Sequence, residues 1–109
     1  MSNEQFPDWF LHLRQKHGKL IEAVQELGKV IRKEGPLDEK TSQLIQLAAA
    51  ATIRSEGAVH SHTKRALSAG AEPDEIYHAI MLLTSTIGFP NVSAALSWVG
   101  DVLEKKEEK

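Results

Sequence analysis

Two histidines one residue apart, His60 and His62, are the residues of this chain whose types and spacing most suggest chemistry. They lie in the segment RSEGAVHSHTKRALSAGA, residues 54–71. Helical zinc pairs are spaced four residues apart, whereas residues two apart on a helix point in directions about 200° apart. The spacing therefore disfavours a local metal pair, and we expect no metal and no cofactor. A ligand set completed by a distant histidine or a second subunit stays open.

The remaining interpretations concern proton transfer. If a helix runs through this segment, His62 lies on its inner flank beside Val59 and Ala66, while His60 falls toward Lys64 and solvent. His62 is then either a structural histidine satisfied by a carbonyl or hydroxyl group, or a general acid or base in a small pocket. Spacing alone favours the structural interpretation.

Composition and charge narrow the possible classes of function. The chain has 109 residues, no cysteine and a net charge of −2, which predicts one domain over residues 1–109. Without cysteine there are no disulfides, thiolate metal sites or thiol-based catalysis. No basic cluster points to nucleic acid or a membrane surface as partner. Neither a signal peptide nor a membrane-spanning stretch stands out, so we expect a cytoplasmic protein.

Helical periodicity runs through the whole sequence and predicts an all-α fold of about six helices. The first helix begins around Pro7, with Phe6, Phe10, Leu13 and His17 on one face, and the second stops at Gly35-Pro36 and has an apolar stripe of Leu20, Val24, Leu27 and Ile31. The third helix is capped by Asp38 and ends near Gly57, and the fourth runs from about Ala58 to Ala69 and is closed by Gly70. The fifth helix begins at Glu72-Pro73, with Ile76, Ile80, Leu83 and Ile87 facing inward, and the sixth begins at Phe89-Pro90, with Val92, Leu96, Val99 and Leu103 facing inward. We expect the charged C-terminal tail to be solvated and frayed.

The fifth and sixth helices are apolar on more than one side. Tyr77, Met81 and Leu82 lie away from the inward stripe of the fifth, and Ala94, Trp98 and Val102 do the same in the sixth. A helix that is apolar nearly all round must be buried nearly all round, and large apolar patches are unusual on monomers. We therefore expect a homo-oligomer.

The segment from Leu37 to Trp98 resembles the carboxymuconolactone decarboxylase family, which includes the alkyl hydroperoxidase D-like proteins. The resemblance rests on the LDEKT opening, the alanine-rich third helix, the His-x-(Lys/Arg)-x-Ala-Leu-x-x-Gly pattern from His62 to Gly70, and the Pro-Asp-Glu-Ile start of the fifth helix. It implies the helical fold of that family and assembly as a trimer or hexamer.

The redox branch of this family uses two cysteines, a histidine and a glutamate. The resemblance places the cysteines at Ser55 and Ala58, the histidine at His62 and the glutamate at Gln43. A serine hydroxyl is hardly ionised near neutral pH and cannot form a disulfide, and a glutamine cannot exchange a proton there. Thiol peroxidase activity is therefore disfavoured.

Three functions remain under consideration. In the first, His62 shuttles a proton on a small lactone or oxo-acid, as a decarboxylase-like lyase would, helped by Gln43, Ser55 and His60. In the second, the protein is a non-catalytic member of the family that binds a small ligand or a partner. The third is the peroxidase activity of the redox branch, against which both missing cysteines count.

Overall fold

The computed structural model describes residues 8–104, and within them the chain is helical with no strand. The helices are α1 (Asp8–Lys16), α2 (Gly18–Lys33), α3 (Glu39–Thr52), α4 (Glu56–Ser68), α5 (Pro73–Met81), α6 (Thr84–Ile87) and α7 (Phe89–Leu103). The predicted all-α fold is confirmed. Phe6, Pro7 and all but the first residue of the charged C-terminal tail, for which a helix start and fraying were predicted, lie outside the described residues.

Helices α3 and α4 form the hairpin that positions His62. The Asp38 carboxylate accepts a hydrogen bond from the backbone N–H of Thr41 at 2.8 Å, which caps α3 as predicted. At the other end, the predicted boundaries are wrong: α3 stops at Thr52, and α4 begins at Glu56. The reason is local, since Arg54 takes a positive φ of 57° and Ser55 caps α4 through the N–H of Ala58 at 3.4 Å. His60 and His62 therefore both lie within regular helix.

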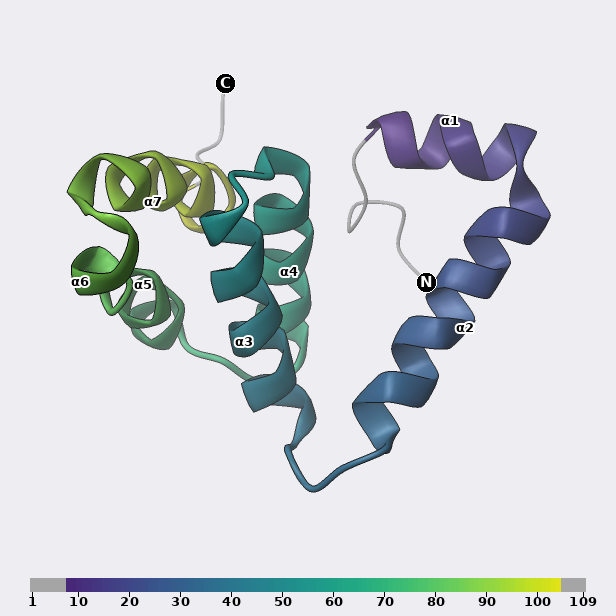
Figure 1. The fold of residues 1–109 in the computed structure, drawn as a ribbon, viewed down its shortest axis with the longest axis horizontal. Helices are drawn as coiled ribbons and strands as arrows, with labels where there is room; N and C mark the ends of the chain where they lie inside the picture. Colours follow the sequence, from purple (N-terminus) through teal and green to yellow (C-terminus); the bar gives the residue numbers. More distant parts are fainter. Residues whose placement is uncertain (1–7, 105–109) are drawn as a thin grey trace.

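The core lies among α3, α4, α5 and α7, which pack against one another. Its fully buried side chains come from all four helices and include Leu47, Val59, Ile76, Ile80, Val92 and Val99. All of these except Leu47 are residues that the sequence analysis above placed inward or on the inner face. Figure 1 shows α4 beside α3, with α5, α6 and α7 on the side away from α2. This packing buries one face of α3 and α4 and leaves the opposite face toward α2.

The predicted fifth helix does not run unbroken to Ile87. It ends at Met81, and α6 follows as a single short turn from Thr84. Two hydrogen bonds divert the chain: the Thr84 hydroxyl donates to the Met81 carbonyl at 2.8 Å, and the Leu83 N–H donates to the carbonyl of Ile80, three residues back. The inward prediction still holds, because Leu83 and Ile87 pack against the core.

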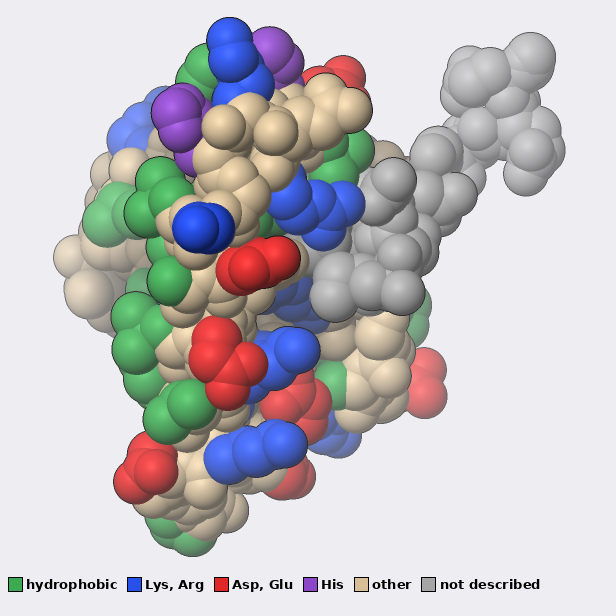
Figure 2. Space-filling view, turned by 90° about the vertical axis from the view of Figure 1, so that its right-hand side faces the viewer, with side chains coloured by type: hydrophobic (Ala, Val, Ile, Leu, Met, Phe, Trp, Pro, Cys, Tyr) green, Lys and Arg blue, Asp and Glu red, His purple; other side chains and the backbone are tan. Residues whose placement is uncertain are grey.

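Helices α1 and α2 form an arm that packs mainly on itself. Figure 1 shows this arm standing beside α3 and α4, joined to them by the loop after α2. The apolar stripe predicted on α2 faces solvent, since Leu20, Leu27 and Ile31 are 55%, 57% and 56% exposed. In Figure 2 hydrophobic side chains gather along one edge of the molecule, beside a face rich in charged side chains. No helix within residues 8–104 is long and apolar enough to cross a membrane.

Candidate functional site

A hydrogen bond joins the two residues at the centre of the candidate site. His62 Nδ1 lies 2.8 Å from Gln43 Oε1, linking α4 to α3. Gln43 is 1% exposed, so its amide is fixed inside the protein. The structure thus brings together two of the predicted site residues that lie 19 positions apart in the sequence.

The orientation of the Gln43 amide sets the tautomer of His62. Gln43 Nε2 donates to Glu39 Oε2 at 2.9 Å, and Arg32 Nε lies 3.4 Å from the same carboxylate oxygen. Because a carboxylate only accepts, the amide nitrogen must face Glu39 and the amide oxygen must face His62. His62 Nδ1 therefore donates its proton to Gln43, and Nε2 keeps a lone pair that can accept a proton or a hydrogen bond.

The surroundings of His62 keep its ring neutral. Burial lowers the pKa of His62 to about 4, and the positive charges of Arg65 and Arg32 contribute in the same direction. Gln43 offers no negative charge to offset them. At neutral pH the site therefore presents an uncharged imidazole with its Nε2 lone pair available.

Two cavities meet at His62. The larger, of about 480 Å³, lies between α2 and the α3–α4 hairpin, and its lining includes Val24, Gly28, Gln43 and His62. The smaller, of about 430 Å³, lies between α1 and α4, and its lining includes Trp9 and His62. Both volumes suit a small molecule. The arm formed by α1 and α2 supplies one wall of each cavity, so the site depends on where the arm sits.

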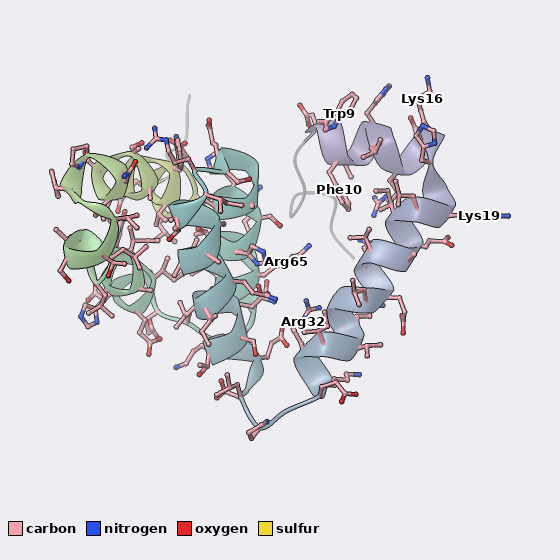
Figure 3. The ribbon with its side chains drawn as sticks, viewed as in Figure 1. Trp9, Phe10, Lys16, Lys19, Arg32 and Arg65 are labelled. Carbon is pink, nitrogen blue, oxygen red and sulfur yellow. The ribbon has the colours of Figure 1, made fainter. Side chains whose placement is uncertain are left out.

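Positive charge concentrates at this site. Arg65 lines both cavities and Arg32 lines the larger one. Figure 3 shows Arg32 on α2 and Arg65 on α4 extending into the space between the arm and α4, with Phe10 at its upper end. Burial and the neighbouring charge of Arg32 lower the pKa of Arg65, while the nearby Glu39 raises it. A bound anion would relieve this crowding of positive charge.

Ser55 lines the smaller cavity, at the start of α4. Its hydroxyl already accepts the N–H of Ala58, so its first role is to cap the helix. Ala58 lines the same cavity beside His62, and both side chains are small. The two positions at which the resemblance places the cysteines of the redox branch therefore border the same cavity as the imidazole.

His60 lies apart from the other predicted site residues. Its Nε2 is 2.9 Å from Asp101 Oδ2 on α7 and 4.0 Å from Glu56 Oε2 on its own helix. His62 instead contacts Gln43 on α3, so the two histidines of the HSH sequence have different partners. Arg54 is also remote from His62, because its guanidinium binds Asn91 and lies over the Trp98 ring.

Sequence reasoning did not identify three polar residues of the site. Arg32 lies on α2, whose approach to α4 no sequence motif indicates, and the sequence marks Glu39 only as part of the LDEKT opening. Gln46 lies one helical turn beyond Gln43 and lines the larger cavity. Its Oε1 is buried and has no hydrogen-bond partner within the described part of the chain. The three-residue spacing of Gln43 and Gln46 was the available signal, since residues three apart share a helix face.

Comparison with known proteins identifies the family of this chain. The family model for the carboxymuconolactone decarboxylase family matches residues 18–101. An uncharacterized protein of Methanocaldococcus jannaschii is 36% identical over 87 residues, covering 76% of this chain and 81% of that protein. An uncharacterized protein of Haemophilus influenzae is 34% identical over 71 residues, covering 56% and 63%. The match includes all of α2, α3 and α4, and the chain belongs to the carboxymuconolactone decarboxylase family.

Proposed function

We propose that the cavities at His62 bind a small anionic metabolite of the oxo-acid or carboxylated lactone class, and that His62 transfers a proton at Nε2. The observation that carries this proposal is the 2.8 Å bond from His62 to Gln43 beside the cavity lined by Arg32 and Arg65. The bond fixes the ring and leaves one nitrogen for chemistry, while the arginines supply the charge that attracts a carboxylate.

An anionic ligand would change the chemistry of His62. The empty site disfavours the imidazolium through burial and through two neighbouring positive charges. A carboxylate bound between Arg65 and His62 would offset those charges and raise the pKa of His62 toward neutral. The imidazole would then accept a proton from the bound molecule more readily than it does in the free protein.

The alternative is a non-catalytic family member that binds the same class of ligand. Its support is Gln43, which hydrogen-bonds to His62 but cannot pass a proton onward. The two functions differ in turnover and share ligand binding. Peroxidase chemistry of the redox type stays disfavoured, because the chain contains no cysteine, and Ser55 and Ala58 stand where the resemblance places the two thiols.

Calorimetric titration with a panel of small oxo-acids and carboxylated lactones, followed by an assay for turnover, tests the proposal. In the variant His62→Asn, the amide N–H replaces the donor to Gln43 while the Nε2 lone pair is lost. We expect this variant to lose turnover and to bind at least tenfold more weakly. His78→Asn is the matched control, because His78 is an exposed histidine on α5. Equal binding by both variants, or no binding by the wild type, would contradict the proposal.

We further propose that the protein is a homo-oligomer, a trimer or hexamer as in the family. The exposed apolar residues that support assembly are only in part those that the sequence analysis named. Met81 and Leu82 are exposed as expected, but Trp98 is half-buried, packs against the core and lies under Arg54. Within residues 8–104, a longer run of exposed apolar side chains lies instead along the α2 stripe. A second copy that covers this stripe would also hold the arm over the His62 cavities.

A further inference from the structure

Glu56, His60 and Asp101 form a second polar cluster, on a part of α4 away from the His62–Gln43 contact. Glu56 and His60 lie one turn apart on α4, and Asp101 lies near the end of α7. His60 Nε2 is 2.9 Å from Asp101 Oδ2 and 4.0 Å from Glu56 Oε2. One ligand atom from each residue falls within 4.8 Å of the other two.

Within this cluster, the His60 ring nitrogen can donate a hydrogen bond to only one of the two carboxylates. The imidazole Nε2 can carry one proton, which it directs at Asp101 at 2.9 Å. Glu56, at 4.0 Å, is beyond hydrogen-bond distance of the same nitrogen. Two carboxylates therefore converge on one imidazole nitrogen that can serve only one of them. A single cation between the three groups would serve both carboxylates and the nitrogen at once.

The spacing of the three atoms is close to that of ligands around one ion. Metal–ligand distances of roughly 2.0–2.2 Å place neighbouring ligand atoms about 3.0–3.5 Å apart in tetrahedral or octahedral geometry. The separations in the cluster bracket this value, and small rotations of the exposed Glu56 and Asp101 side chains would bring all three atoms onto one centre. One imidazole and two carboxylates also balance a charge of +2.

We propose that Glu56, His60 and Asp101 bind a divalent transition-metal ion of the zinc type. The imidazole ligand favours such an ion over calcium or magnesium, whose sites are built from oxygen. Each residue supplies one ligand atom, and water fills the remaining positions. The ion would tie the start of α4 to the end of α7. This site is independent of the proposed function, because His62, Gln43 and Arg65 take no part in it.

Metal titration of the full-length, tag-free protein after removal of metal by a chelator tests this inference. We expect one equivalent of Co²⁺ to give a visible d–d spectrum, and one equivalent of Zn²⁺ to displace it. His60→Ala should weaken Co²⁺ binding at least tenfold. His78→Ala, which removes an exposed histidine on α5, should leave it unchanged.

A second variant separates metal binding from the structural role of the His60–Asp101 contact. In Asp101→Asn the amide oxygen can still accept the His60 hydrogen bond, so the helices stay joined, but the charged ligand is lost. We expect Zn²⁺ to raise the melting temperature of the wild type and not of this variant. The inference is overturned if the wild type shows no saturable binding, or if His60→Ala and Asp101→Asn bind Co²⁺ as tightly as the wild type does.

Discussion

The low pKa of His62 predicts a loss of stability in mild acid that a single substitution should remove. Well above pH 6.5 the imidazole is neutral in both the folded and the unfolded protein, so there it makes no pH-dependent contribution. Between pH 6.5 and about 4 the unfolded chain binds a proton that the folded ring does not. Stability therefore falls as the pH is lowered through this window.

The size of this loss follows from the difference between the two pKa values. A pKa lowered from 6.5 to about 4 corresponds to about 3 kcal/mol if the ring were fully shielded from water. His62 is only half-buried, and solvent screening reduces the expected loss to about 1–2 kcal/mol. That is a measurable share of the stability of a small domain.

Urea unfolding at a series of pH values between 7.5 and 4 measures this loss. Asp38 and Glu75, whose pKa values are lowered by their hydrogen bonds, also lose stabilising contacts in acid. They titrate alike in the wild type and in His62→Asn, so the difference between the two proteins isolates His62. Parallel stability curves for the two proteins across pH 6.5 to 4 would refute the assignment of a buried neutral imidazole.

Three further predictions follow from the site, the exposed stripe and the composition. Gln43→Glu should raise the pKa of His62 above about 4, because a carboxylate 2.8 Å from Nδ1 would stabilise the imidazolium. NMR titration of the ring measures the change, and an unaltered pKa would count against the contact between His62 and residue 43. Light scattering should give a mass several times 12.1 kDa for the wild type. Leu27→Asp on the exposed stripe should reduce this mass, and Lys33→Asp on the polar side of α2 should not. A monomeric wild type would contradict the proposal of an oligomer. The protein should not consume hydroperoxide with a dithiol reductant above the buffer blank, since it has no cysteine, and turnover that survives removal of trace metal would contradict this.

Much of the fold could be predicted from local signals. Asp38, Glu72-Pro73 and Phe89-Pro90 mark helix starts whose chemistry is contained in a few neighbouring residues. The boundary between α3 and α4 was missed because Arg54, a residue with no special preference for positive φ, makes the turn. The break after Met81 was missed because the inward stripe continues across it.

Only those residues of the candidate site that belong to the family pattern were predicted to lie together. Gln43 and His62 were paired through the resemblance, and the structure joins them by a hydrogen bond. The contribution of Arg32 depends on the arm folding back beside α4, which periodicity cannot indicate. The same holds for Asp101, 41 positions from His60, so sequence reasoning about the two histidines could not place them with these carboxylates.

The central claim is that His62 faces a site for small anions, and its imidazole reports directly on that claim. Ring carbon NMR can follow the protonation of His62 in the wild type and in Arg65→Met, with and without the tightest-binding oxo-acid or lactone carboxylate of the panel. The account predicts a pKa near 4 in the free protein, a rise on addition of the compound, and a smaller rise in Arg65→Met. A pKa near 6.5 in the free protein, or one that no compound of the panel moves, would contradict it.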